Sequence, residues 1–494
     1  MFIYRKFILF ISIIVVFITI EFAYADINTS YEIFRETQTP DRDRRLAIDL
    51  FQSKYFFSSL AFSKNYIAEI NKIDPLFEIY IEKLILKTGT MSFSYMQEKT
   101  LKKHLYSPSI ALAYGFRLSQ KKKWQQALRT LTVIPNHHRF SAEARMMEGA
   151  ANTMINKDLE AEKSYMNCIK IAKELEEISS VKKQGRYYSI LKDTCAIHLA
   201  RIEYKNANYD KSMELYNLIP KVSYQWPFML IEKAWTAYQL EDFNRSLGII
   251  VTYKSPLLSS YFFPETEVLK SLSYFKLCLY RDSLKTIEQY YKVYKTRSEA
   301  LKALLIDHKH SNTYFLKMMF APIHVVEKLN PYIRNLMTQI RKKIKFSIDL
   351  VAYKRVQNEL KNLQKLHSGK LSDILQDELK ETLRIRTTHL NHFIKKKMFD
   401  FINDIHRFSY EMFNIKIEIL AKKRDLVWKN KMLIADRSRG SHKNISRKAQ
   451  EHFYDFKGEF WADELGDYSF GLKSNCELIR VKTQASIESN EVSK

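Results

Sequence analysis

Apolar residues recur at helical spacing along most of this chain, and the breaks in that pattern divide it into segments. Residues 44–105 predict helices that are interrupted at Asp74-Pro75 and at Gly89. From residue 108 to 295 the predicted helices are short and come in pairs, and several pairs end at a proline because proline cannot continue a helix. Beyond Pro331 the breaks become rare. The pattern predicts an all-α protein with two kinds of helix.

A small residue returns at one fixed position in the paired helices. Ala127 and Ala161 are 34 residues apart, and so are Ser212 and Ser246; 51 residues separate the two couples, and Ser283 follows after 37. Packed helices approach closely only where the side chains at their crossing are small. An interval near 34 residues is typical of helix-turn-helix repeats. Gly115 and Gly149 are further structural positions, in the first helices of their pairs. Three residues before each small residue lies an aromatic residue, except that Asp158 takes this place in one unit. The aromatic residues are Trp124, Tyr209, Phe243 and Tyr280.

These units resemble the tetratricopeptide repeat family. The resemblance rests on segments such as SIALAYGFRLSQKKKWQQALRTLTVIP (109–135) and EKAWTAYQLEDFNRSLGIIVTYKSP (232–256), and it covers five units from about Pro108 to Tyr294. A sixth, degenerate unit is predicted around Tyr55 and Ser58. The resemblance implies a superhelix that binds other proteins as a scaffold or adaptor. With the apolar run from Phe7 to Ile20 at the N-terminus, the repeats also resemble exported bacterial members of the family, which implies a role in outer-membrane assembly, secretion or motility machinery.

In that family the first helix of each pair lines the partner-binding groove. Aromatic side chains interleaved with cations at these positions suit a partner with apolar and acidic segments. The alternative is that the aromatic residues belong to the core of the repeats. The asparagine pattern of the family's carboxylate-binding members is missing, so capture of a C-terminal carboxylate is not implied. The register predicts a groove made of Arg201, Tyr204, Lys205, Trp235, Tyr238, Gln239, Leu272, Phe275 and Lys276.

A second pattern lies in the C-terminal third, where residues 371–431 contain no helix breaker. Apolar residues there alternate at steps of four and three, which is the seam of a coiled coil. We expect an antiparallel hairpin hinged at Ser368-Gly369, in which the helix ending at His367 covers the seam. The alternative is a homodimer through residues 394–419. The seam consists of Ile394, Met398, Phe401, Ile405, Phe408, Met412, Ile415 and Ile419.

The charge balance adds a preference for acidic partners, because 80 Lys and Arg against 55 Asp and Glu give a net charge of +25. Association with peptidoglycan or an anionic membrane surface is therefore the alternative function. Excess lysine also decorates solvated helix faces, and no recognition module accompanies the charge, so nucleic-acid binding is not predicted.

Enzyme chemistry is not predicted either. The chain has no glycine-rich phosphate loop and no GxSxG motif. His308 and His310 lie in a polar break and are expected to be exposed, and His137-His138 is expected in a loop. His389 and His392 are three residues apart, unlike the pair of an HExxH motif. We expect no catalytic residues, no metal and no cofactor.

The first 25 residues indicate export. Arg5 and Lys6 precede an apolar run from Phe7 to Ile20, and Ala23-Tyr24-Ala25 supplies small residues for cleavage after Ala25. A periplasmic or otherwise exported protein is expected; the alternative is an uncleaved signal that anchors the chain to the inner membrane.

The four cysteines lack CxxC spacing, which argues against zinc. Cys168, Cys195 and Cys278 fall in predicted repeat helices, where a free cysteine packs as a small apolar residue. Oxidation after export is the other outcome, and the spacing of these three and Cys476 does not fix a connectivity.

These patterns together predict the organisation of the chain. The predicted segments are a signal peptide (1–25), a flexible lead (26–42), a helical N-terminal cap with the degenerate repeat (43–107), tetratricopeptide-like repeats (108–295), a connector (296–330), a long helical hairpin or coiled coil (331–431), a C-terminal cap (432–482) and a disordered tail (483–494).

Overall fold

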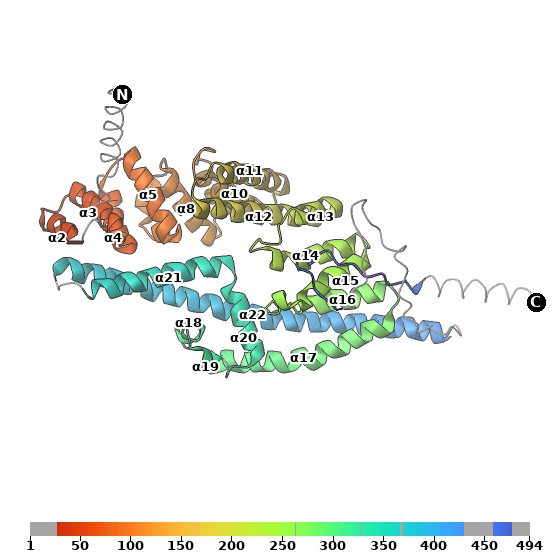
Figure 1. Ribbon diagram of the computed structural model, residues 1–494. Coiled ribbons are helices and arrows are strands. Elements are labelled where there is room, and N and C mark those ends of the chain that lie inside the picture. Colours follow the sequence, from red (N-terminus) through yellow and green to blue (C-terminus); the bar gives the residue numbers. More distant parts are fainter. Residues whose placement is uncertain (1–26, 262, 327, 366–368, 429–457, 477–494) are drawn as a thin grey trace, which may run out of the picture. The chain divides into compact units, whose positions relative to one another are not determined.

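The computed structural model describes residues 27–261, 263–326, 328–365, 369–428 and 458–476 (Figure 1). The predicted signal peptide, the tail and the first part of the C-terminal cap lie outside the described residues. Within the described ranges the regular secondary structure is helical and no β-strand occurs, so the all-α prediction is confirmed. None of the helices in these ranges has both the length and the apolar character needed to cross a membrane.

The N-terminal helices are α2 (Ile27–Arg35), α3 (Pro40–Gln52), α4 (Phe56–Glu69), α5 (Pro75–Thr88), α6 (Met91–Ser94), α7 (Glu98–Lys103), α8 (Pro108–Gln120), α9 (Trp124–Leu131) and α10 (Ser141–Met154). The central helices are α11 (Asp158–Glu177), α12 (Lys182–Lys205), α13 (Tyr209–Asn217), α14 (Trp226–Gln239), α15 (Phe243–Val251), α16 (Glu265–Lys276) and α17 (Tyr280–Asp307). The C-terminal helices are α18 (Tyr314–Met319), α19 (Ile323–Val326), α20 (Pro331–Arg341), α21 (Ile344–Leu363) and α22 (Lys370–Trp428).

The chain divides into two compact units. Unit 1 contains the residues up to Lys157 together with Ile348–Thr387, and unit 2 contains Asp158–Ser347 together with the residues from Thr388 onward. The division falls between α10 and α11, inside the first turn of α21 and again inside α22. The predicted block of repeats at 108–295 is thus shared between the units, and α17 continues past its predicted end to Asp307.

Six helix-turn-helix junctions share one backbone geometry. Each holds a single residue with a left-handed φ of 58–68°, and none of the six is glycine. The residue that follows donates its N–H to a carbonyl five positions earlier, as Asn208 does to Glu203 at 2.9 Å, which is the Schellman termination of a helix. The intervals between the later junctions, 34, 51, 34 and 37 residues, match those of the small residues, and the first lies 68 residues before the second. The six residues are Lys54, Lys122, Asn156, Ala207, Glu241 and Cys278.

The small residues lie where the paired helices cross, and all five predicted anchors are fully buried. Ser212 Oγ donates to the backbone carbonyl of Ala200 at 2.9 Å, and Ser283 Oγ donates to that of Ser271 at the same distance. Glycine serves the same purpose in α8, because a Cβ at Gly115 would lie 2.6 Å from Leu131 Cδ2. The close approach of helices thus explains the repeated residue type.

The degenerate sixth unit exists, but its predicted register is one residue out. Ser59 Oγ donates to the carbonyl of Ala47 at 2.9 Å, the same twelve-residue contact found in the later units. Ser58 lies beside it and contacts the carboxylate of Glu359. The run Tyr55-Phe56-Phe57 offers an aromatic residue in three consecutive registers, so the sequence pattern could not distinguish them.

In unit 1, α21 and the start of α22 form a helical hairpin that belongs to the same core as the N-terminal helices (Figure 1). Glu359 of α21 accepts hydrogen bonds from the N–H groups of Phe57 at 2.9 Å and Ser58 at 3.2 Å, so it caps the N-terminus of α4. The hairpin side of the core consists of Ala352, Val356, Leu363, Leu371, Leu375 and Leu379.

In unit 2 all eight residues of the predicted seam are buried, but the predicted cover is only partly right. Tyr290 Oη of α17 donates to the carbonyl of Ile405 at 2.8 Å, and Tyr291 Oη donates to that of Ser409 at 2.7 Å. Tyr332 of α20 packs against Phe401 with ring centroids 5.5 Å apart. Helices α17 and α20 therefore cover the seam, and a second copy of the chain is not needed to bury it.

The helix predicted to end at His367 is also interrupted. It divides into α20 and α21 at Lys342-Lys343 without a glycine or proline. Both ammonium groups lie over aromatic rings of unit 2: Lys342 Nζ is 4.4 Å from the ring centre of Tyr261, and Lys343 Nζ is 3.8 Å from that of Phe228. These cation–π contacts favour the break.

Residues 458–476 pack on the repeats of unit 2. Leu465 joins the buried cluster of α14, and Phe470 N–H donates to the carbonyl of Asn244 at 3.0 Å. Two disulfides, Cys168–Cys195 and Cys278–Cys476, complete this unit. Of the two outcomes that the sequence left open for the cysteines, free thiols or oxidation, the structure has oxidation.

Candidate functional site

The predicted groove residues lie on one face of unit 2, formed by the C-terminal turns of the first helices α12, α14 and α16. None of the nine belongs to the buried core. The aromatic residues among them, Tyr204, Trp235, Tyr238 and Phe275, are half-buried, as is Leu272. The remaining residues, Arg201, Lys205, Gln239 and Lys276, are exposed. We call these nine residues the first-helix face.

Polar contacts join successive helices of the first-helix face. The Arg201 guanidinium forms two hydrogen bonds to the Glu232 carboxylate, at 2.6 and 2.7 Å. Trp235 Nε1 donates to Glu265 Oε1 at 2.9 Å, and Gln239 Nε2 donates to Tyr204 Oη at 3.2 Å. A bidentate arginine–carboxylate pair has a defined geometry, so these contacts hold the face in one arrangement.

Three of the four aromatic residues of the face pack against an aromatic residue that opens the next helix. Tyr204 packs against Tyr209 with ring centroids 5.4 Å apart, and Tyr238 packs against Phe243 at 5.3 Å. The pair of Phe275 and Tyr280 repeats this arrangement at 5.7 Å. The aromatic residues predicted as structural positions of the repeat therefore restrict the rotamers of those predicted to bind a partner. Rigid aromatic side chains lose little entropy on binding.

Two of the three cations of the face already have carboxylate partners. Arg201 is already paired with Glu232, and Lys205 is paired with Asp158 at 2.7 Å. Burial raises the pKa of Glu265, and the hydrogen bond from Trp235 lowers it. Three charged residues of α22 also act on this pKa: Arg407 lowers it, and Asp404 and Glu411 raise it. The acidic side of α22 therefore lies beside this face. Arg201 and Lys205 are therefore engaged within the protein, whereas Lys276, the third cation of the face, is exposed.

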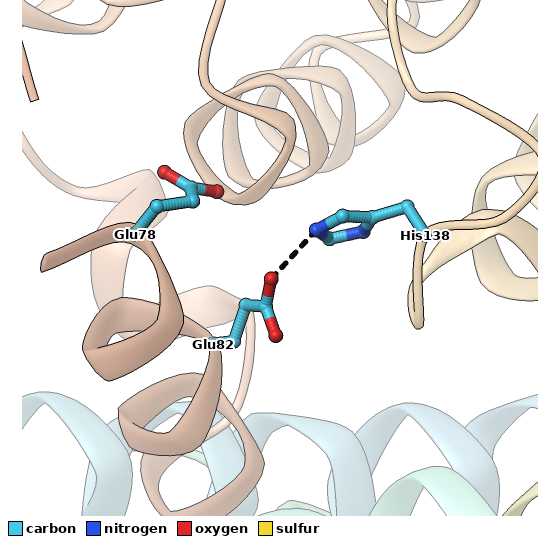
Figure 2. Close-up of side chains that lie close together, drawn as sticks. All are labelled: Glu78, Glu82 and His138. Carbon is cyan, nitrogen blue, oxygen red and sulfur yellow. Dashed lines mark hydrogen bonds and ion pairs between the residues drawn. The ribbon is translucent and has the colours of Figure 1, made fainter. Parts of the chain in front are cut away.

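A second cluster brings Glu78, Glu82 and His138 together in unit 1 (Figure 2). The two glutamates lie one turn apart on α5, and His138 lies in the turn between α9 and α10. One potential ligand atom from each residue lies within 4.8 Å of the others. His138 Nε2 contacts Glu82 Oε1 at 2.8 Å, while Glu78 accepts from Ser107 Oγ at 2.6 Å.

The hydrogen bonds of this cluster favour a structural role over metal binding. Phe140 N–H donates to His138 Nδ1 at 3.2 Å, so Nδ1 is an acceptor and the proton of the neutral ring lies on Nε2. That proton is donated to Glu82. A metal-binding histidine has the opposite arrangement, with one nitrogen donating to a protein oxygen and the other left for the metal. The cluster thus holds the turn before α10 against α5. Sequence patterns did not predict it, because its members are up to 60 residues apart.

The other histidines singled out in the sequence do not form such a cluster within the described residues. His308 is half-buried and stacks on the ring of Tyr314, with centroids 3.3 Å apart, so its predicted exposure is wrong. His310 is exposed, as expected.

Comparison with known proteins adds no family. The chain matches no protein-family model and no curated protein. Among solved structures it matches a chain of the crystal structure of the APC/C hetero-tetramer Cut9–Hcn1, with 12% identity and a TM-score of 0.29. The match covers 68% of this chain and 55% of the other, so this chain spans about half the length of that protein.

Proposed function

We propose that this protein is a non-catalytic scaffold that binds partner proteins through the first-helix face of unit 2. The observation that carries the proposal is a row of half-buried aromatic residues that pack against further aromatic rings, with hydrogen bonds that join Tyr204 and Trp235 to neighbouring helices. Tyrosine and tryptophan in such settings are the residues that dominate binding energy at protein interfaces. The paired cations and the nearby acids of α22 favour an apolar or aromatic segment that presents hydrogen-bond donors.

We propose further that the protein works outside the cytoplasm, in a bacterial cell envelope. Two disulfides support this proposal, because structural disulfides are rare in the reducing cytosol. The predicted signal peptide points to the same compartment. Which machinery the scaffold serves follows from the identity of its partner.

Site-specific photo-crosslinking in cells tests the binding face. A photoreactive phenylalanine analogue replaces Tyr204 or Tyr238, and, as a control, Val222, which is 92% exposed in the turn before α14. Adducts to one defined protein from positions 204 and 238, but not from 222, are the expected result. Identical adducts from all three positions, or adducts only from 222, would contradict the proposal.

Substitution then measures the contribution of the face. The double variant Tyr204→Ala/Tyr238→Ala should weaken binding of the crosslinked partner at least tenfold, since truncation of an interface hot spot costs about 2 kcal/mol or more. Circular dichroism must show unchanged helicity. The milder Tyr204→Phe removes only the hydroxyl that accepts from Gln239 and should keep most of the affinity.

The compartment is tested separately. Fractionation and N-terminal sequencing should find the mature chain beginning at Asp26 in the envelope fraction, with all four cysteines protected from alkylation until reduction. An intact Met1 together with cysteines that react without reduction would contradict export.

A further inference from the structure

The C-terminal half of α22 carries a second apolar stripe that the fold of unit 2 leaves exposed. Phe399 is 58% exposed, Tyr410 73%, Phe413 52%, Ile417 49% and Leu420 50%. From Tyr410 to Leu420 the stripe advances by steps of three, four and three residues. That spacing is the one that makes a continuous seam along a helix.

This exposed stripe is distinct from the buried seam. At about 100° per residue, Phe413 and Ile417 lie about 100–160° around α22 from Met412 and Ile415. The buried seam faces α17, as the hydrogen bonds of Tyr290 and Tyr291 show. The acidic residues of α22 lie beside the first-helix face, on a third side. The buried seam of α22 thus contacts α17, its acidic side lies near the first-helix face, and its exposed apolar stripe faces solvent.

The width and spacing of the stripe favour a helix as its occupant. A narrow stripe at alternating steps of three and four is the surface that a second helix covers, whereas a membrane-bound helix presents a broader apolar face. Residues 410–424 make about four helical turns, enough for knobs-into-holes contacts along a partner helix.

The charges beside the stripe indicate the chemistry of that helix. In a helix pair, the positions that flank the apolar stripe meet the flanking positions of the partner. Between residues 407 and 423 these positions hold basic or neutral side chains and no acid. A second copy of this chain would bring lysine against lysine or leave the lysines unpaired, whereas flanking carboxylates would be complementary. The flanking residues are Arg407, Ser409, Asn414, Lys416, Ala421 and Lys423.

We infer that this stripe is a docking surface for an amphipathic helix of a partner protein, with apolar residues at heptad spacing and Asp or Glu beside them. The surface is separate from the first-helix face, so the inference does not depend on the proposed function. The protein would then hold two partners, or two segments of one partner, at different places on unit 2.

Two synthetic peptides test the inference on the full chain. Both carry three heptads with leucine at the two apolar positions, and they differ only in having Glu or Lys at every flanking position. Each peptide repels its own copies, so it remains a monomer. In fluorescence anisotropy the Glu peptide should bind at least tenfold more tightly than the Lys peptide. Lys416→Glu/Lys423→Glu should reverse that preference.

Substitution of the stripe locates the binding. The double variant Phe413→Ser/Ile417→Ser should reduce affinity for the Glu peptide at least tenfold. The control is Leu257→Ser, which changes a 65% exposed apolar residue elsewhere in unit 2 and should leave the affinity unchanged. Unchanged affinity of the stripe variant, or no binding of the Glu peptide to the natural chain, would overturn the inference.

Two other occupants would also overturn it. Sedimentation that shows a dimer of the natural chain and a monomer of the Phe413→Ser/Ile417→Ser variant would assign the stripe to self-association. Binding to phosphatidylglycerol vesicles that this variant loses, without binding of the Glu peptide, would assign it to a membrane surface. Tyr204→Ala/Tyr238→Ala should leave peptide binding unchanged, so failure of the first-helix face is distinguishable from failure here.

Discussion

The hydroxyl of Ser212 donates a hydrogen bond to the backbone carbonyl of Ala200, twelve residues earlier in the chain. The same contact recurs between Ser59 and Ala47 in unit 1 and again at Ser283. It marks the point where two helices of a pair touch, so one small side chain both permits the approach and binds across it. The repeat is therefore visible as a repeated bond as well as a repeated interval.

Substitution at Ser212 should separate these two contributions. Ser212→Ala removes a buried hydrogen bond and should cost about 1 kcal/mol of unfolding free energy. Ser212→Leu overpacks the crossing and should cost ~1–3 kcal/mol. Denaturant unfolding of the full chain measures both. Ser164 is the control, because it is a half-buried serine whose hydroxyl donates to the carbonyl of Glu160 in its own helix. Equal losses at both serines would contradict the crossing geometry.

Gly248 should be required for docking of residues 458–476. A Cβ at this position would lie 1.8 Å from the carbonyl oxygen of Tyr468, so Gly248→Ala must displace the segment. Helix α15 itself should tolerate alanine, which forms helices better than glycine. Limited proteolysis should then cut within 458–476 while circular dichroism stays unchanged. Gly185→Ala, whose nearest neighbour is 3.8 Å away, should leave the segment protected.

Glu359 should make the stability of unit 1 depend on pH. Burial raises the pKa of Glu359 from an ordinary value of 4.5 to about 7. The hydrogen bonds from backbone N–H groups lower this pKa, but burial has the larger effect. The folded chain therefore holds the proton more tightly than the unfolded chain, so protonation stabilises the fold. That contribution is complete below pH 4.5 and is lost as pH rises through 7.

The difference in unfolding free energy between the natural chain and Glu359→Gln isolates this effect. It should fall by up to ~3 kcal/mol between pH 4.5 and 7 and stay level above pH 7. Glu148, whose pKa burial also raises to about 7, contributes equally to both proteins and cancels. A difference that is constant across this range would show that Glu359 remains ionised in the fold.

A charge in the buried seam should disrupt α17 together with α22. Ile405→Asp places a carboxylate among apolar residues and should cost several kcal/mol, because a buried charge without a partner is strongly unfavourable. Hydrogen exchange should accelerate in both helices, and less in unit 1. Ile417→Asp is the matched control on the exposed side of the same helix, where the same change should alter stability by less than about 0.5 kcal/mol. Similar effects of the two changes would contradict the assignment of the two sides.

Much of the fold followed from local patterns. The small residues located the crossings, and the heptad spacing identified the long helix and its buried residues. The turn geometry could not be predicted, because Lys122, Ala207 and Glu241 occupy left-handed positions without the glycine or asparagine that usually signals them. A tight turn followed by a well-packed helix imposes this conformation on whichever residue is present.

The partners of individual residues were harder to predict than their positions. The sequence predicts that the neighbouring helix covers the seam, and α20 of that helix does contact it, but Tyr290 of α17 contacts Ile405 from 115 residues away. The groove positions were located on the correct helices, yet the carboxylate that neutralises Arg201 comes from the next unit, at Glu232. The pairing of Cys278 with Cys476 spans 198 residues and has no local signal at all.

The discontinuity of unit 1 bears on how the protein is made. Its core needs Val356, Leu375 and Leu379, and the N-terminus of α4 needs Glu359, yet the whole helical stretch 158–347 of unit 2 lies between these residues and α10. During synthesis, the N-terminal helices must therefore wait with an uncovered apolar surface until about residue 387 has left the ribosome. A chain translocated in an extended state would meet its late-made partners only on the far side of the membrane, where the whole of unit 1 can assemble at once.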